Sequence, residues 1–526
     1  MSDRTIKTIS AVGSGVTTSF FDEDGMSKTI ESLLSDVVEF YKEEQKTPWV
    51  IGYSGGKDST AVLQIVWMAL QRINKEDLKR DVYVVTNDTL VENPVVQHWV
   101  KQSHLQMDEA AKRQGLPISC KMLTPIIDET FWVNLIGRGY PAPNRRFRWC
   151  TERMKIHPTT RFIKEQVQKS GEAIIFLGAR KAESAARAKR IEKYDKKSVR
   201  DNLNLSPHND LEAALVYKPI VDWIDDDVWA FLMSYENPWG YENENLLNMY
   251  AGATADGECP LVIDTSTPSC GSSRFGCWTC TVVAKDKSMS AMIQNSAEKE
   301  WMLPLLDLRN ELAEAGKETR DFRRMNGRVS LFNGEYVAGP YTQETRAYWL
   351  RKVLQAQTWV RENGPPEVSD IELITIEELH EIRRMWIVDK HEHEDLLPGI
   401  YKEETLKDFP TEGLLDLFPF GSEDLKILEE VSDSDLQYEL LRELVSLEHF
   451  ARSKTRRMGL YESIDSAFDR SGWETREEAI NHMKAVSQAA EEAAEGKQTD
   501  YYEVLKEVIF VNESEEDHVS EEINSQ

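Results

Sequence analysis

The sequence predicts an α/β protein with a parallel β-sheet, followed by a mostly helical C-terminal region. Three observations lead to this fold class. Between residue 48 and about residue 235, short β-branched apolar runs alternate with helical stretches, which is typical of a parallel sheet with helical crossovers. Residues 236–286 are loop-rich, with Gly, Pro and four cysteines. Beyond about residue 287 the chain is helical and charged.

Five short apolar segments bounded by polar or turn residues are predicted to be strands. They are PWVIGY (48–53), DVYVVTN (81–87), ISCKML (118–123), AIIFLG (173–178) and YKPIV (217–221). Helices are expected at 26–45, 58–72, 93–114, 159–169 and 225–235, and later at 343–363 and around 435–453. The Gly-Pro-Pro run at 364–366 breaks the helical region in two.

These patterns divide the chain into four parts. Residues 1–25 are rich in Ser, Thr, Gly and Asp and are expected to be flexible. Residues 26–295 form the sheet domain with its cysteine cluster, and residues 296–510 form the helical region. Residues 511–526 carry six carboxylates and no Lys or Arg, so we expect a disordered acidic tail.

Composition and charge limit the environment and the partners. Hydrophobic residues make up 40% of the 526 residues and charged residues 29%, as in a soluble globular protein. We find neither a run of eighteen apolar residues nor a signal segment, so we expect a cytoplasmic protein with no membrane contact. The net charge of −28 repels polyanions, and binding to nucleic acid therefore needs a local basic patch or a basic partner.

Two segments are locally basic despite this charge. Residues 176–200 hold nine Lys or Arg against three Asp or Glu, and RRFRWCTERMK spans residues 145–155. Either segment is a candidate site for a polyanion. The alternative for both is a solvated helix face.

The segment between the first strand and its helix has the chemistry of a phosphate-binding loop. Glycines let the backbone approach a ligand closely, and the N–H groups at the helix start favour an anion. The lysine adds a full positive charge, and the serines add hydroxyl donors. The motif is not that of kinases and GTPases, because Asp58 follows Lys57. The loop consists of Ser54, Gly55, Gly56, Lys57, Asp58 and Ser59.

Two other predicted strands end in polar residues that should reach the same sheet edge. The second strand ends with Thr86, Asn87 and Asp88. The fourth is followed by Gly178, Arg180, Glu183 and Arg187. Arg180 is suited to clamping a phosphate through two N–H groups. The alternative is that these residues are surface charges at helix starts.

The six cysteines favour a metal site over disulfides in a reducing compartment. Cys120 lies within a predicted strand and is interpreted as a core thiol. Four others fall within 22 residues, and one precedes them. They suit either a structural zinc site or a [4Fe-4S] cluster, and the presence of a single CxxC pair favours the cluster. The candidates are Cys150, Cys259, Cys270, Cys277 and Cys280.

SGGKDS resembles the PP-loop of the ATP pyrophosphatase family, and LGARKAES and TNDTLVENP resemble the sulfonucleotide-reductase branch of that family. The resemblance implies an adenine nucleotide alpha hydrolase-like fold, binding of ATP with Mg²⁺, adenylation of a substrate oxygen and release of pyrophosphate. It implies catalytic roles for Lys57, Asp58 and Arg180. It implies nucleotide contacts from Ser54, Gly55, Gly56, Ser59, Thr86 and Gly178 as well.

Together with RRFRWCTERMK and CGSSRFGCWTCTV, these motifs are similar to the DndC-type proteins of DNA phosphorothioate modification, over about residues 45–295. The resemblance implies a sulfurtransferase that replaces a non-bridging oxygen of the DNA backbone by sulfur. It implies a cysteine desulfurase as sulfur donor and companion Dnd or Ssp proteins as partners.

The same resemblance implies cluster ligands at Cys150, Cys277 and Cys280. Trp149 stands where sulfonucleotide reductases carry a paired cysteine, so a fourth ligand must come from elsewhere. We expect Cys270, which is nearer in sequence, with Cys259 as an alternative ligand or a sulfur carrier.

Three other functions remain open at this stage. A phosphoadenylyl-sulfate reductase ends in Glu-Cys-Gly, whereas this sequence has no cysteine after Cys280. A tRNA thiolase should carry a more basic RNA-binding domain. A non-catalytic iron–sulfur scaffold would use ATP only as a switch. In the helical region, Arg320, Arg323, Arg324 and Arg328 are a weaker candidate for DNA contact.

Overall fold

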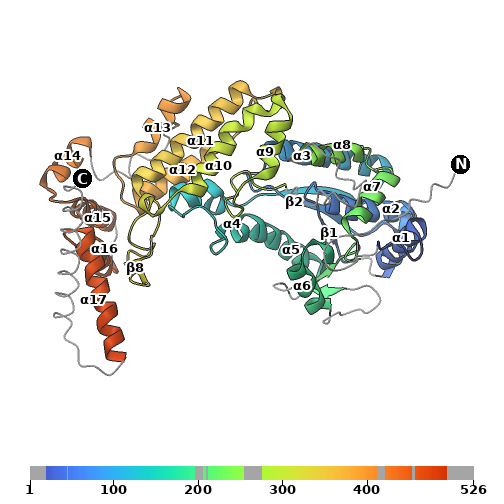
Figure 1. The fold of residues 1–526 in the computed structure, drawn as a ribbon, viewed down its shortest axis with the longest axis horizontal. Helices are drawn as coiled ribbons and strands as arrows, with labels where there is room; N and C mark the ends of the chain where they lie inside the picture. Colours follow the sequence, from blue (N-terminus) through green and yellow to red (C-terminus); the bar gives the residue numbers. More distant parts are fainter. Residues whose placement is uncertain are drawn as a thin grey trace, which may run out of the picture. The chain divides into compact units, whose positions relative to one another are not determined.

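The computed structural model describes residues 19–43, 46–195, 205–208, 211, 213–253, 275–410, 421–452 and 457–494 (Figure 1). The chain divides into two compact units. The first contains residues 1–131, 143–313 and 359–371, and the second contains residues 132–142, 314–358 and 372–526.

A six-stranded, mostly parallel sheet forms the centre of the first unit. The strand order is β3-β2-β1-β4-β6-β5, and β5, which pairs with β6, is antiparallel. The order reverses between β1 and β4, and this makes the carboxyl ends of these two strands the switch point where such sheets bind ligands. The strands are β1 Trp49–Gly52, β2 Val82–Asn87, β3 Ile118–Leu123, β4 Ala173–Phe176, β5 Ser206–Pro207 and β6 Ala214–Tyr217.

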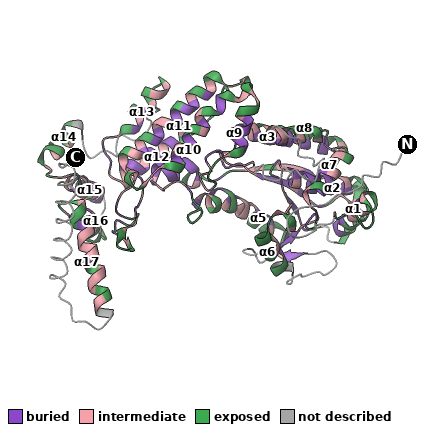
Figure 2. Ribbon diagram, viewed as in Figure 1, coloured by how far each residue is buried: buried purple, intermediate pink, exposed green. Residues whose placement is uncertain are grey.

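Alternating side chains of the strands build a core on each face of the sheet. Ile174 and Phe176 of β4 face the larger core, which α1, α2, α3 and α7 cover. Ala173 and Ile175 face a smaller core with Ile163 of α5. Figure 2 shows the strands as a buried layer between helices that are exposed on their outer sides. The result is the three-layer arrangement expected of an α/β unit.

One helix of this unit, α3, begins and ends where the chain supplies caps. At the start of α3 the side chain of Asn93 accepts a hydrogen bond from the Val95 amide, and Pro94 occupies the first turn. The same helix ends at Gly115 in the left-handed conformation, with φ of 65°. The helices are α1 Met26–Glu43, α2 Lys57–Gln71, α3 Pro94–Gln114, α4 Trp149–Thr151, α5 His157–Ser170, α6 Ala185–Asp195, α7 Asp225–Ser234, α8 Asn243–Gly252, α9 Lys287–Asn295 and α10 Leu303–Glu314.

Three features of this unit differ from the expectations or go beyond them. The predicted strand at 217–221 lies earlier, as β6 at Ala214–Tyr217, because Pro219 has no N–H for the ladder. The region 236–286, predicted to be loop-rich, contains the helix α8. The short antiparallel strand β5 was not predicted, since two residues carry no periodic signal. The sheet is therefore mostly, not wholly, parallel.

In its described residues, the second unit is mostly helical and contains one hairpin, of β7 Leu331–Phe332 and β8 Glu335–Tyr336. Two buried tryptophans tie its segments together: Trp132 Nε1 donates to the Leu373 carbonyl at 2.6 Å and Trp386 Nε1 to the Ile136 carbonyl at 2.9 Å. The predicted helix at 343–363 is confirmed as α11 Gln343–Asn363. The later helices are α12 Ile376–Arg384, α13 Leu396–Thr405, α14 Ser422–Val431, α15 Asp435–Arg452, α16 Leu460–Ser471 and α17 Arg476–Ala494.

Short helical segments of other types interrupt both units. Three are π-helical: η3 Val133–Gly137, η4 Glu152–Ile156 and η9 Met385–Asp389. Six are 3₁₀ turns: η1 Lys75–Asp77, η2 Ile127–Glu129, η5 Lys181–Glu183, η6 Ala297–Met302, η7 Lys317–Thr319 and η8 Pro366–Val368. Of the helices in the described parts of the chain, none combines the length and the apolar character that crossing a membrane requires.

Candidate functional site

The loop after β1 has a backbone that only glycine allows. Gly55 has φ of 75°, and a Cβ atom there would lie 2.5 Å from Cγ2 of Val100. Hydroxyl groups brace the loop from inside: the Ser54 amide donates to Ser59 Oγ at 3.1 Å, and Ser59 Oγ donates to the Gly56 carbonyl at 3.0 Å. The loop is thus held in one shape before any ligand is present.

Lys57, the first residue of α2, is buried with 8% of its surface exposed. Its amide donates to Tyr250 Oη at 3.3 Å, and its ammonium lies 5.6 Å from the centre of the Tyr250 ring. Nζ lies 3.3 Å from Asp225 and 3.5 Å from Asp58. These contacts fix the position of a cation at the carboxyl edge of β1.

Arg180, which follows β4, is almost fully buried, with 2% exposed. Its Nε donates to Asp58 at 2.7 Å, Nη2 donates to Asp225 at 2.5 Å, and Nη1 donates to a backbone carbonyl, that of Trp223, at 3.2 Å. The guanidinium therefore holds the two carboxylates that face Lys57. In this structure Arg180 positions the loop, and the phosphate clamp expected of it stays a prediction.

Asp225 at the start of α7 is the acid that links the two cations. Burial alone would raise the pKa of its carboxyl group, but the charges of Lys57 and Arg180 outweigh burial and lower it. Asp225 is thus an anion at neutral pH. Its role was not predicted from the sequence.

Gly178 lies where the segment after β4 passes the start of α2. A Cβ atom at this position would come within 2.9 Å of the backbone carbonyl carbon and oxygen of Asp58. Because backbone atoms cannot move aside cheaply, a side chain here would push the two segments apart. Gly178 lets them meet at the switch point.

A cavity of about 530 Å³ opens at this switch point. Of the predicted nucleotide residues, Ser54, Asp58, Ser59 and Gly178 line it. Those that do not line it are Gly55, Gly56, Lys57, Thr86 and Arg180. The remaining wall carries one acid, Glu183, which pairs with Arg187, and three further basic side chains suited to an anion: Arg190, His208 and Lys218.

Thr86 at the end of β2 is buried and serves the sheet. Its hydroxyl donates to the Tyr53 carbonyl at 2.6 Å and lies 2.8 Å from His104 Nε2. With its proton used in the first bond, the hydroxyl accepts from the histidine. Burial lowers the pKa of His104 to about 4, so the ring is neutral. The predicted contact of Thr86 with a nucleotide stays a prediction.

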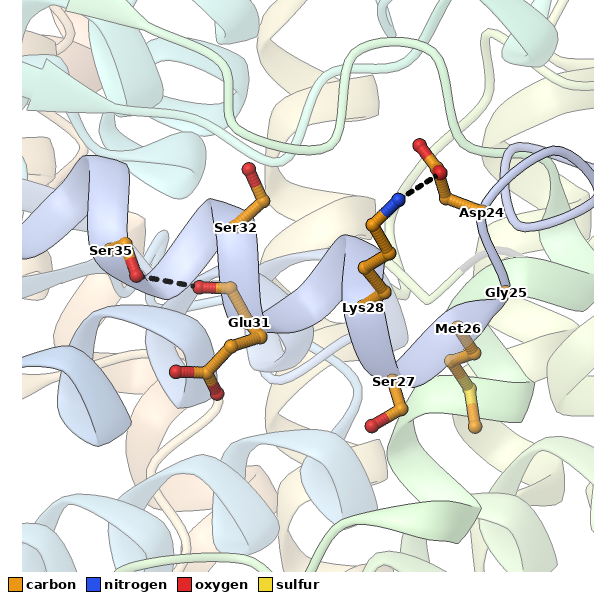
Figure 3. A pocket seen from close by; sticks show the side chains of 8 residues that line it. All are labelled: Asp24, Gly25, Met26, Ser27, Lys28, Glu31, Ser32 and Ser35. Atoms are coloured by element: carbon orange, nitrogen blue, oxygen red, sulfur yellow. Dashed lines mark hydrogen bonds and ion pairs between the residues drawn. The ribbon is translucent and has the colours of Figure 1, made fainter.

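A larger hollow, of about 770 Å³, runs along the start of α1 (Figure 3). Its charges are already matched: Lys28 pairs with Asp24 at 2.5 Å, and Glu31 pairs with Arg72 at 2.6 Å. Only residues from 24 to 35 line it, none of which belongs to the nucleotide loop. We assign the ligand site to the smaller cavity at the switch point, where strands, glycines and cations meet.

The predicted cluster ligands lie on one continuous run of helix and on one loop. Cys150 lies in α4, which passes through the π-helical η4 into α5, and Lys155 lies in η4. Cys277 pairs through its backbone with Glu92, and the Trp278 amide donates to the Val91 carbonyl at 2.9 Å. The CxxC segment is thereby tied to the edge of the sheet beyond β2.

Lys155 lies near three cysteines. Cys277, in its ionised form, is the main cause that raises the pKa of Lys155, against the opposing effect of burial; Glu92, Cys150 and Cys280 add to it. Lys155 Nζ lies 3.7 Å from Glu92. Burial, with Glu92 nearby, raises the pKa of the Cys277 thiol to about 12. Lys155 and Glu92 had no motif that would have revealed them.

The donor set suits a thiolate-bound metal group, because soft sulfur ligands lie beside a cation that offsets their charge. Across the described residues, however, no three His, Cys, Asp or Glu side chains converge closely enough to hold a metal ion. Cys259 and Cys270 lie outside the described residues. The cluster ligands Cys150, Cys277 and Cys280, and a fourth ligand, therefore stay a prediction.

Cys120 lies apart from this group, in β3. Its amide donates to Asp108 at 2.9 Å, and its sulfur lies 3.8 Å from the sulfur of Met107. Burial raises the pKa of this thiol. These contacts are those of a core thiol.

Residues 48–283 match the family model of the phosphoadenosine phosphosulfate reductase domain. This part of the chain is therefore similar to a phosphoadenosine phosphosulfate reductase domain. The match confirms the coarser resemblance predicted from SGGKDS and LGARKAES. The DndC-type resemblance stays a prediction.

An uncharacterized protein of Methanocaldococcus jannaschii is 26% identical over 197 residues, which are 38% of this chain. The match spans about a third, 34%, of that relative's length.

Two solved structures are similar at a TM-score of 0.26. A phosphoadenylyl-sulfate reductase from Candida auris is 12% identical and covers 43% of this chain and 91% of its own. A U34-tRNA thiolase from Methanococcus maripaludis, with its [4Fe-4S] cluster, is 15% identical and covers 56% of this chain and 82% of its own. Likenesses this weak do not extend the assignment.

Proposed function

We propose that this protein is the ATP-dependent sulfurtransferase of a DNA phosphorothioation system, with ATP pyrophosphatase activity. The proposal rests on two groups of residues that lie within the same reductase-like unit. A PP-loop whose Ser54, Asp58 and Ser59 line the switch-point cavity carries a buried lysine, and three cysteines lie near a second lysine. The first group suits activation of an oxygen by ATP, and the second suits handling of sulfur.

The first step is adenylation of a backbone phosphate. A non-bridging oxygen of the DNA attacks the α-phosphorus of ATP, the α–β bond breaks, and pyrophosphate leaves. Lys57, and the Mg²⁺ that accompanies ATP, offset the charge that builds on the pyrophosphate. Asp58 and Asp225, held by Arg180, keep the Lys57 ammonium in place.

The second step replaces the activated oxygen. Sulfur at the oxidation level of hydrosulfide attacks the DNA phosphorus, the bond from phosphorus to the adenylated oxygen breaks, and AMP leaves with that oxygen while the sulfur loses its proton. A [4Fe-4S] cluster, when bound, supplies a store of sulfur at this level. Cys150, Cys277 and Cys280 would hold it, with Cys270 or Cys259 as the fourth ligand.

The partners follow from the same chemistry. A cysteine desulfurase supplies the sulfur as a persulfide, a thiol reductant releases it as hydrosulfide while being oxidised to a disulfide, and companion Dnd or Ssp proteins assist in bringing the DNA. The net charge of −28 makes a basic companion or a local basic contact necessary for a DNA substrate.

Substitution of Lys57 tests the ATP half of the proposal. Lys57→Ala should lower pyrophosphate release from ATP by 10²- to 10³-fold, roughly the loss seen when one preorganised charge-stabilising group is removed from an active site. Lys42→Ala, an exposed lysine on α1, is the matched control and should leave the rate unchanged. Wild-type rates in Lys57→Ala, with the fold intact by circular dichroism, would contradict the assignment of the loop.

The family match also favours a second candidate, reduction of phosphoadenylyl sulfate to sulfite. That reaction needs a thiol reductant and releases no pyrophosphate from ATP. Sulfite production without pyrophosphate release would therefore replace the first proposal with this one. Sulfur found in tRNA in place of DNA would keep the chemistry and change the substrate.

A further inference from the structure

The loop that precedes Cys150 carries positive charge that the protein does not neutralise. Its five residues, NRRFR at 144–148, are all exposed. Within the described parts of the chain, Arg145, Arg146 and Arg148 have no carboxylate at ion-pair distance. Among the other exposed arginines of the described residues, Arg72, Arg161, Arg187, Arg351, Arg384 and Arg457 are each paired with an acid, whereas Arg113, Arg190, Arg324 and Arg328 have no such pair but do not lie three to a five-residue loop. In a chain with net charge −28, three unmatched arginines in one loop point to an external anion.

The loop is held in a defined turn. Asn144 Oδ1 accepts hydrogen bonds from the amides of Arg146 at 2.9 Å and Phe147 at 3.0 Å. The backbones of Asn144 and Phe147 also bond each other in both directions, at 3.1 and 3.2 Å. The arginines therefore project from a turn that needs no ordering when a ligand binds.

Both ends of the loop are anchored beside the thiols. On one side, Thr281, the residue after Cys280, donates its hydroxyl to the Pro143 carbonyl at 2.5 Å. On the other, Trp149, the residue before Cys150, is buried and stacks on Phe131 with ring centres 5.4 Å apart. A ligand bound by the loop therefore lies next to Cys150 and Cys280.

Phe147 gives the loop a second kind of contact. Its ring is 43% exposed, between two arginines in sequence. Guanidinium groups bind phosphates in a planar, paired manner, and an exposed aromatic ring stacks on a nucleobase whatever its identity. Within a duplex the bases stack on each other, so stacking on a protein ring requires an unpaired base.

We propose that the loop 144–148 binds an unpaired stretch of a nucleic acid strand, with its arginines on the phosphates and Phe147 on a base, and so presents the backbone to the thiols. This inference rests on the proposed function and deepens it, because it specifies a locally single-stranded substrate. An acidic protein would also attract the arginines, but it offers nothing for which an exposed ring is needed.

Fluorescence anisotropy with the full-length protein tests the proposal. The probes are a labelled 12-nucleotide single strand of mixed sequence and the same strand in a duplex, each titrated over a series of NaCl concentrations. We expect the single strand to bind more tightly than the duplex. Changing Arg145, Arg146 and Arg148 together to Ala should reduce the slope of log affinity against log salt by about 2, because each phosphate contact on a single strand contributes about 0.7.

The Phe147→Leu variant separates stacking from charge. It should lower single-strand affinity about tenfold, within the range measured for loss of one stacking ring, and leave the salt slope and duplex affinity unchanged. Phe20→Leu is the matched control, since Phe20 is 44% exposed. A charge-matched control changes Lys101, Lys112 and Arg113 on α3 to Ala, all exposed, and should bind like the wild type.

Failure of the inference is distinguishable from failure of the proposed function. If DNA is phosphorothioated yet all loop variants bind the single strand like the wild type, the inference alone is overturned. If the loop variants lose binding while no sulfur enters DNA, the loop assignment stands and the proposed function fails. Arginine-dependent binding of poly-glutamate with no binding of either oligonucleotide would overturn the nucleic acid assignment in favour of an acidic protein.

Discussion

The nucleotide loop and the cysteine region lie in the same unit but are built in different ways. At the loop, charges are matched by charges of the protein: Lys57 faces Asp225, and Arg180, 2% exposed, holds Asp225 and Asp58. In the cysteine region, one lysine, Lys155, lies near Cys150, Cys277 and Cys280, and its side chain is 46% exposed. The charges of the nucleotide loop are paired within the protein before a ligand binds. The interactions of the thiols in the cysteine region depend instead on what these thiols bind.

This difference predicts that the two regions fail in different ways. Removing a charge from the loop leaves buried partners uncompensated and should destabilise the folded protein. Removing a thiol leaves no buried charge and should alter metal content with little effect on stability. The next three tests separate these outcomes.

The largest expected effect is on bound metal. Cys277→Ser should remove most of the iron and sulfide from anaerobically purified protein, because a hydroxyl is a poor substitute for a thiolate ligand. Iron and sulfide analysis of the wild type should give about four of each per chain, the stoichiometry of one cubane cluster. Cys120→Ser is the control and should leave both unchanged.

Binding of a different metal would contradict the expected difference between the two regions. One zinc per chain without sulfide would make the cysteines a structural clip, and Cys277→Ser should then destabilise the fold as well. Iron that persists in Cys277→Ser would show that the ligand set is wrong.

The next effect in size is on stability at the loop. Arg180→Met should lower the free energy of unfolding by about 3–5 kcal/mol, because it removes the shared partner of Asp58 and Asp225 from a buried site. Urea denaturation at pH 7 measures it. Arg72→Met, which breaks the exposed pair with Glu31, should cost no more than about 1 kcal/mol. Equal losses in both variants would contradict the distinction drawn here.

The smallest expected effect is on the pH dependence of stability, through the buried side chain of His104. Burial lowers the pKa of His104 from its ordinary value of 6.5 to about 4. The unfolded chain therefore binds the proton first as pH falls, and stability that is complete above pH 6.5 should fall by up to about 3 kcal/mol on approaching pH 4.

His104→Gln should flatten this pH dependence without abolishing it, because burial also lowers the pKa of His393 in the second unit to about 4. Urea titrations at pH 7 and pH 4.5 compare the two proteins. An unchanged slope in the variant would show that His104 is protonated without cost and that its surroundings are wetter than its burial indicates.

Much of the fold could be predicted because local signals and tertiary needs agree. β1 to β4 and α2, α3, α5 and α7 lie within a few residues of the expected ranges, since apolar periodicity, Asn93 and Gly115 all favour the same ends. β6 was misplaced because YKPIV reads as apolar while Pro219 cannot donate to the ladder.

The candidate site was predictable only where a motif carried it. SGGKDS marked the loop, but Tyr250 reaches Lys57 from 193 residues away and leaves no local pattern. Arg180 was correctly expected at the sheet edge, yet its partners depend on packing that brings α7 beside α2. The arginine loop was visible as a basic segment, whereas its turn and its lack of acid partners required coordinates.

The π-helical segment η4 changes which residues share one face of the helix. In a regular α-helix, residues five apart, such as Cys150 and Lys155, point about 140° away from each other, since each residue turns the chain by about 100°. The wider π turn, closed by bonds between residues five apart, brings such positions towards one face. The π turn adds one residue to the helix from 149 to 170 compared with a regular α-helix. This extra residue turns Lys155 towards the side of the helix that carries Cys150. This arrangement therefore constrains the number of residues in the helix more than the identity of most of its side chains.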